Sequence, residues 1–241
     1  RGTIRILGEP LTERAKERIG YLPEERGLYR NVRLLDCLVY LGELKGMGRA
    51  RASERAMALL ERVELADQAR SKIKELSKGM QQKAQFVATI LHDPELVILD
   101  EPFQGLDPIN VELVKEMILE MGEEGKTVVL STHQMNLVEE LCNRILLINQ
   151  GRSVLYGPLA EIKARYAQHS VILSCEGSLG EITGARRVER RGLDYEVFLE
   201  DGVSPQDVLR QLVERGVPVT RFEVATPPLE EIFIAVVEGE R

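Results

Sequence analysis

Two adjacent carboxylates stand at the end of an apolar run. In ELVILDEPFQGLDP, residues 95–108, apolar residues lead directly into Asp100 and Glu101. Such a run is typical of a strand buried on both faces, and open α/β sheets bind ligands at the carboxyl ends of their strands. Two carboxylates there suit magnesium nucleotide chemistry, in which one holds the metal and the other orients or deprotonates a water. Asp100 and Glu101 alone would favour a solvated acidic turn, whereas the QGLDP residues that continue the segment favour a functional site.

A second segment with the residue types of an anion site is LSKGMQQK, residues 76–83. Ser77 and Gly79 at the mouth of a helix offer backbone N–H groups and the positive end of the helix to a phosphate. An ordinary Ser N-cap followed by a polar helix face explains the same residues equally well. The segment can therefore be interpreted only together with the other motifs of the chain.

A histidine is expected at the same edge of the sheet as the two carboxylates. His133 directly follows the strand-like run VVLST. A lone His after a strand is more often a turn residue or a hydrogen-bonded core residue. Because Asp100, Glu101 and His133 would gather at one edge, a functional site is favoured over that interpretation.

The elements that would position these residues alternate between strand and helix. Strands are expected at 1–8, 18–22, 95–99, 127–131, 144–148 and 153–157, and helices at 33–46, 50–64, 77–92, 108–121 and 135–143. This alternation predicts an α/β fold with a mostly parallel sheet. A connecting helix at 158–169 leads to short strands and two further helices, which predict a small α+β module.

Composition excludes several classes of protein. The chain has 241 residues, of which 44% are hydrophobic, so it can bury a core and is not a disordered tail. Its net charge is −7, and residues 160–241 hold 10 Lys and Arg against 15 Asp and Glu, which argues against nucleic-acid binding. Cys37, Cys142 and Cys175 are odd in number and widely spaced. They favour a reducing compartment over a disulfide framework or a zinc site.

These segments, in this order, resemble the nucleotide-binding subunit of ABC transporters. LSKGMQQK is similar to the signature motif, LVILDEP to Walker B with its catalytic glutamate, GLDP to the D-loop and STH to the switch-histidine loop. IGYLPEERGLY takes the place of the Q-loop, with Glu24 where the family usually has Gln. Lys78 and Met80 depart from the usual LSGGQ, and with the ELKGM segment they resemble the sodium- and drug-exporting branch.

The resemblance implies a fold and a domain arrangement. Residues 1–158 would form a P-loop NTPase-like ABC ATPase domain, with a mostly parallel sheet and a helical signature subdomain. Residues 159–241, which end PPLEEIFIAVVEGER, resemble the small C-terminal α+β domain of the exporting branch.

The resemblance also implies roles at the site. Asp100 would organise Mg²⁺, Glu101 would be the general base toward the hydrolytic water, and His133 would contact the γ-phosphate of ATP. Ser77 and Gly79 would clasp ATP bound to the opposite subunit, because the family sandwiches two nucleotides between head-to-tail domains.

Four further residues are assigned by the same resemblance. Met80 and Gln81 belong to the segment that contacts nucleotide, and Asp107 would cross the interface between the two subunits. Glu24 would touch the metal or the water and couple the site to a permease, although a carboxylate there alters the charge at the metal.

A P-loop is missing from the residues at hand. G-x-x-x-x-G-K-[ST] wraps phosphates with backbone N–H groups, and no segment of the chain matches it. The nearest approach, Gly125-Lys126-Thr127, lies before a strand and has no Gly five residues upstream. We therefore expect that the chain, which begins at Arg1 without Met, lacks an N-terminal portion with Walker A and by itself binds ATP weakly or not at all.

The leading hypothesis is an ATP-binding and ATP-hydrolysing subunit of an exporter. Its expected cofactors are ATP and Mg²⁺, and its expected partners are a separate ABC-2 type membrane permease and a second ATPase subunit, identical or paired, without nucleic acid. Its expected location is cytoplasmic, on the inner face of the membrane through the permease. Two alternatives stay open: a soluble ABC ATPase that does not transport, and a non-catalytic module that pairs with a competent subunit.

Overall fold

The computed structural model describes residues 2–25, 27–166, 170–175, 179–200 and 202–239. The chain divides into two compact units, residues 1–134 and residues 135–241. The expected domain boundary between residues 158 and 159 stays a prediction. In the described part of the chain, no helix is both long and apolar enough to cross a bilayer.

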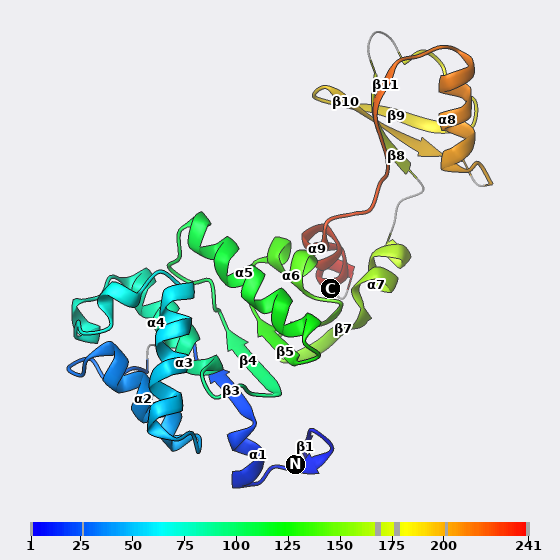
Figure 1. Ribbon diagram of the computed structural model, residues 1–241. Helices are drawn as coiled ribbons and strands as arrows, with labels where there is room; N and C mark the ends of the chain where they lie inside the picture. The colour runs from blue at the N-terminus through cyan, green and yellow to red at the C-terminus, as the bar shows by residue number, and fades with distance from the viewer. Residues whose placement is uncertain (1, 26, 167–169, 176–178, 201, 240–241) are drawn as a thin grey trace. The chain divides into compact units, whose positions relative to one another are not determined.

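Unit 1 is built on a parallel sheet in the order β3-β4-β5 (Figure 1). Its strands are β3 (Ile19–Leu22), β4 (Leu96–Asp100) and β5 (Thr127–Ser131). β4 is central, and its residues Leu96, Val97 and Leu99 are buried, as the unbroken apolar run predicts. Asp100, the last residue of β4, pairs with Ser131, the last residue of β5, so the two strands end at the same edge.

Helices fill both crossovers of this sheet. Between β3 and β4 lie α2 (Leu34–Leu44), α3 (Arg49–Arg62), two short 3₁₀ helices (Ala66–Gln68 and Ile73–Glu75) and α4 (Lys78–Ile90); between β4 and β5 lies α5 (Pro108–Glu123). α2 and α3 pack on each other and on α4. They bury apolar stripes that include Leu38, Ala56 and Leu60, as their helical spacing predicts. The α/β fold with a parallel sheet and an attached group of helices is confirmed.

The N-terminal segment differs from its expected single strand. β1 (Arg5–Ile6) and β2 (Glu9–Pro10) form a short antiparallel hairpin, and α1 (Glu13–Glu17) follows. The chain reverses at Leu7 and Gly8, whose φ angles are 51° and 80°. The strand is therefore shorter than the expected residues 1–8, and it ends in a turn at Gly8, as the sequence predicts.

The first half of unit 2 and its C-terminal helix share a core. The elements are α6 (Met135–Leu141), the antiparallel hairpin of β6 (Arg144–Asn149) and β7 (Arg152–Pro158), α7 (Leu159–Tyr166) and α9 (Leu229–Gly239). Ile145, Leu159, Ile162, Leu229 and Ile232 are buried together. The C-terminal helix thus packs against residues that are about 70 to 90 positions earlier in the chain.

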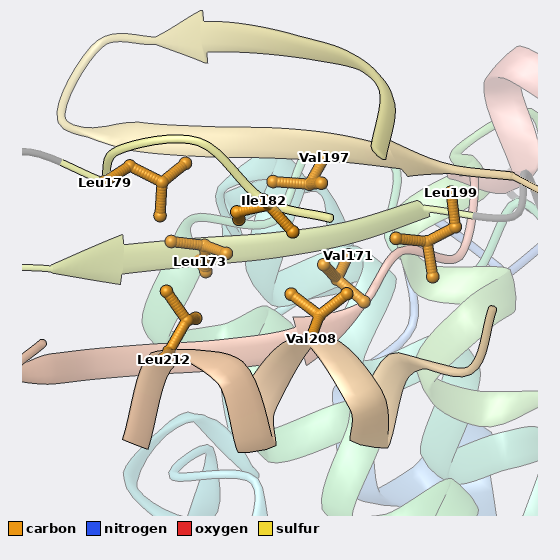
Figure 2. Close-up of a cluster of buried hydrophobic side chains, with 8 residues drawn as sticks. All are labelled: Val171, Leu173, Leu179, Ile182, Val197, Leu199, Val208 and Leu212. Carbon is orange, nitrogen blue, oxygen red and sulfur yellow. The ribbon is translucent and has the colours of Figure 1, made fainter. Parts of the chain in front are cut away.

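The remainder of unit 2 is a small α+β module with a core of its own. Its antiparallel sheet has the order β11-β8-β10-β9, from β8 (Ser170–Cys175), β9 (Ala185–Arg191), β10 (Asp194–Leu199) and β11 (Val219–Val224), and α8 (Pro205–Glu214) lies on one face. Figure 2 shows Val208 and Leu212 of α8 directed toward Val171 and Leu173 of β8. The predicted connecting helix extends to residue 166, and its last expected residues, 167–169, lie outside the described residues.

Candidate active site

The candidate site begins where β4 and β5 end side by side. The backbone N–H of Glu101 donates to the carbonyl of Ser131 at 2.9 Å and extends the pairing of the two strands by one residue. Thr132 and His133 follow on the β5 side. The sheet therefore brings Asp100, Glu101 and His133 to one edge, as the sequence predicts.

The carboxylate of Glu101 is held by the loop after β5. Its Oε1 accepts from the backbone N–H of His133 at 3.0 Å and lies 2.7 Å from His133 Nδ1. Its Oε2 accepts from the hydroxyl of Thr132 at 3.1 Å. The Glu101 side chain is 15% exposed, whereas that of His133 is 82% exposed. A shielded carboxylate next to a solvent-facing imidazole is an arrangement that can accept a proton from a nearby water and respond to an anion.

Asp100 is a carboxylate at the end of a strand that could hold a magnesium ion together with phosphate. It is half-buried at the last position of β4. Among the residues the structure describes, no three His, Cys, Asp or Glu side chains gather as a metal cage. Mg²⁺ in nucleotide sites is bound by one or two carboxylates, waters and substrate phosphates, so a single strand-end carboxylate fits this ion.

The beginning of α4 carries the signature-like residues. Ser77 is its N-cap, and the hydroxyl accepts from the backbone N–H of Met80 at 3.2 Å. A Cβ on Gly79 would lie 3.2 Å from the carbonyl oxygen of Gly105, so this glycine allows α4 to approach the turn after Glu101 closely. The side-chain amide of Gln81 points back and donates to the carbonyls of Ile73 and Leu76, at 3.1 and 2.9 Å.

Asp107 is the N-cap of α5. Its carboxylate accepts from the backbone N–H of Asn110 at 3.0 Å and from the Asn110 side-chain amide at 2.6 Å. These bonds, the backbone one first, lower the pKa of Asp107. The residue is exposed, so it combines a capping role with a position on the surface.

Glu24 lies on the exposed loop that follows β3. The carbonyls on both sides of it, those of Pro23 and Glu25, accept from the Gln85 side chain of α4 at 3.0 and 3.1 Å. The loop is thus held by its backbone, and the Glu24 carboxylate belongs to the exposed surface.

Sequence reasoning missed two residues that contact Glu101 or its loop, Thr132 and Gln82, and a buried lysine near them in the sequence, Lys83. Thr132 lies within the STH segment, and Gln82 and Lys83 lie within LSKGMQQK, so motif position was the available signal. Lys83 is 5% exposed. Burial lowers the pKa of its amine, while the negative charges of Glu64 and Asp107 act in the opposite direction. That Gln82 and Lys83 are buried is visible only in the fold.

Known proteins resemble the chain along its whole length. A family model described as ABC transporter matches residues 1–104, and one described as ATP-binding protein DrrA1-3-like, C-terminal domain, matches residues 157–237. An uncharacterized ABC transporter ATP-binding protein of Alkalihalophilus pseudofirmus is 40% identical over 236 residues, which cover 97% of this chain and 88% of the relative. The chain belongs to the ABC transporter ATP-binding protein family.

Further members and a solved structure agree with this family. An uncharacterized ABC transporter ATP-binding protein of Methanocaldococcus jannaschii is 45% identical, covering 96% of this chain and 82% of the relative. The Nod factor export ATP-binding protein I of Sinorhizobium fredii is 32% identical, covering 99% and 71%. A solved structure described as the ATP binding subunit of an ABC transporter superposes with a TM-score of 0.64 at 31% identity, covering 69% of this chain and 70% of that one. ATP-binding subunits of such transporters work with membrane permease components, and the family is generally one of ATPases.

Proposed function

We propose that the chain is the ATP-hydrolysing subunit of an exporter and drives transport through a separate ABC-2 type permease. The observation that carries the proposal is the geometry at the carboxyl ends of β4 and β5. There Glu101 is shielded and held by Thr132 and His133, with Asp100 directly before it. When water attacks a phosphate, a base and a metal ligand are required in this placement.

Each residue at the edge has a separate task in this proposal. Asp100 holds Mg²⁺, which when bound neutralises charge on the phosphates. Glu101 orients the attacking water and takes its proton. His133 turns its exposed imidazole to the terminal phosphate, which releases Oε1 of Glu101 from the 2.7 Å contact with Nδ1. The base is thereby freed when nucleotide is in place.

A second ATPase subunit completes the site in this proposal. Ser77, Gly79 and Met80 face the nucleotide of the opposite subunit in a head-to-tail dimer, and Asp107 crosses the same interface. Gln81 belongs to the same segment, but its side-chain amide is bound to the carbonyls of Ile73 and Leu76, so it supports the segment from behind. The close approach of Gly79 to the turn before Asp107 supports a continuous surface made of both segments.

A permease surface is proposed near α2. The rings of Tyr29 and Tyr40 meet edge to face, with centroids 5.9 Å apart, and both are exposed, as are Val32 and Leu44. These exposed apolar residues follow the loop of Glu24 in sequence, so a partner bound to them would respond to movement of that loop. The Sinorhizobium relative is named for the export of Nod factor. On this proposal the subunit lies in the cytoplasm, on the inner face of the membrane.

We further propose that hydrolysis needs a P-loop that residues 1–241 do not contain. In the described part of the chain β5 pairs with β4 alone, so a strand that leads into a P-loop has an edge on which to pair. Residues 1–241 alone are expected to bind a fluorescent ATP analogue with Mg²⁺ weakly or not at all. Micromolar affinity in an equilibrium titration would contradict this.

The decisive experiment concerns Glu101 in a chain extended at its N-terminus by a segment that carries G-x-x-x-x-G-K-[ST]. This chain is expected to hydrolyse ATP, and Glu101→Gln to lower kcat by about 10³-fold or more while ATP stays bound, because the amide cannot take the proton. Phosphate release and retained radiolabelled ATP are measured. Full turnover by Glu101→Gln would reject Glu101 as the base. No turnover by the extended parent chain would favour a non-catalytic partner module.

A further inference from the structure

Helix α4 carries two glutamines beyond its first turn that are almost completely buried. Gln82 is 3% exposed and Gln85 is 4% exposed. Separated by three positions, they lie on the same side of the helix. Burying an amide is unfavourable unless its polar atoms are hydrogen-bonded, so their partners indicate what they do.

Gln82 holds the backbone around Glu101. Its Nε2 donates to the carbonyl of Pro102 at 3.0 Å and makes a longer contact, 3.4 Å, with the carbonyl of Glu101. Glu101 has a φ of 45°, in the left-handed region that costs a non-glycine residue about 1–2 kcal/mol. Such a conformation persists where the surroundings hold it. Here the carbonyl of Ser131 accepts from the N–H of Glu101. The side chain of Gln82 contacts the carbonyl of Glu101.

Gln85 holds the loop of Glu24 in the same manner. Its Nε2 donates to the carbonyls of Pro23 and Glu25, on either side of Glu24. Its Oε1 is buried and accepts no hydrogen bond from the residues that the structure describes, which leave out Arg26. The described hydrogen bonds of the Gln85 side chain are therefore made by its donor atom, Nε2.

We propose that Gln82 and Gln85 are positioning residues, which tie the placement of Glu101 and of Glu24 to helix α4. The first turn of that helix carries Ser77 and Gly79, so a ligand that moves this turn would move both loops together. The inference deepens the proposed function and rests on it for the roles of Glu101 and Glu24. The hydrogen bonds that carry it do not depend on those roles.

The test compares Gln82→Met with Gln85→Met in the 241-residue chain, each variant being the control for the other. Methionine keeps the length of glutamine and removes the donor. Two local readouts are recorded on both variants. One is hydrogen exchange at the Gln104 amide, which donates to the carbonyl of Glu101 at 3.1 Å. The other is the rate at which a glutamate-specific protease cuts after Glu24 and Glu25.

Each variant is expected to loosen its own loop. Gln82→Met should speed exchange at Gln104 about fivefold or more and leave cleavage at Glu24 unchanged, and Gln85→Met should do the reverse. If neither readout moves, or if both move equally in both variants, the proposal is overturned. Should a methionine variant not fold, Gln82→Asn and Gln85→Asn, which keep the amide but lack the reach, carry the same expectations.

A kinetic readout separates positioning from general structural support. In the extended chain that hydrolyses ATP, Gln82→Met should lower kcat about tenfold or more and leave KM for ATP within about twofold, since Gln82 contacts the loop of the base. A raised KM with unchanged kcat would overturn the positioning role. Full turnover by Glu101→Gln would instead reject Glu101 as the base in the proposed function, and the exchange and cleavage results would still decide the inference.

Discussion

Glu101 shows how much of one residue's function is set by residues distant in sequence. Its carboxylate is held by Thr132 and His133, about thirty positions later, and its backbone by Gln82, nineteen positions earlier. The sequence predicted that Asp100, Glu101 and His133 share an edge, because parallel strands end together. It did not predict the left-handed backbone at Glu101, since local preference disfavours that conformation for glutamate.

His92 is a second residue whose surroundings determine its chemistry. Burial, with a further contribution from the charge of Lys45, lowers its pKa to about 4, and its Nε2 lies 3.1 Å from the carbonyl of Ile19. The folded pKa lies below the unfolded value of 6.5, so the fold favours neutral His92. Its stabilising contribution is complete above pH 6.5 and is lost as the pH falls toward 4.

We predict that protonation of His92 costs up to about 2 kcal/mol of folding stability between pH 7 and pH 5. His92→Gln keeps a donor for the Ile19 carbonyl and cannot titrate, so its stability should fall less over this range. Urea unfolding of both proteins at the two pH values measures the difference. Equal losses in the parent and the variant would show that His92 does not contribute to the acid sensitivity.

At the scale of elements, the spacing between β3 and α4 depends on one glycine. A Cβ on Gly20 would lie 2.4 Å from the carbonyl oxygen of Thr89 and 3.0 Å from Pro94 Cγ. Because the nearer atom belongs to the helix backbone, the helix or the strand would have to shift.

Gly20→Ala is therefore expected to lower the free energy of unfolding by about 1–3 kcal/mol. Gly122→Ala is the matched control, because Gly122 lies in α5 with no atom within 4 Å of an added Cβ. That change should raise stability by about 0.5–1 kcal/mol through helix propensity. Denaturant unfolding of the two variants measures both changes. An unchanged free energy of unfolding in Gly20→Ala would mean that β3 and α4 can move apart without cost.

At the scale of the whole molecule, the two units have separate cores. Leu99 is fully buried in β4 of unit 1, and Leu212 is fully buried in the α+β module of unit 2. Separate cores predict that unfolding is not a single two-state transition.

Leu99→Ala and Leu212→Ala should each cost about 2–5 kcal/mol in the unit that contains it. In differential scanning calorimetry, Leu99→Ala is expected to shift the transition of unit 1 and Leu212→Ala that of the α+β module, with the other transition held within about 1–2 °C. A single transition that moves equally in both variants would show that the units unfold together.

The sequence by itself determined the local elements and the identity of the edge residues. Helical and strand spacing located the helices and the strands of the sheet to within a few residues, and Ser77 marked a helix start, because spacing and capping are properties of neighbouring residues. The second strand of the N-terminal hairpin was missed, since Glu9 and Pro10 have a low preference for strands.

Only the tertiary structure decided which polar side chains hold the site and where the chain returns. The buried contacts of Gln82 and Gln85 and the packing of α9 against α6 and α7 join segments far apart in sequence. From sequence alone, a glutamine side chain is expected at the surface. Whether it is buried is decided by the other segments that fold against it. Motifs therefore indicated the groups suited to chemistry, and packing decided what holds them in place.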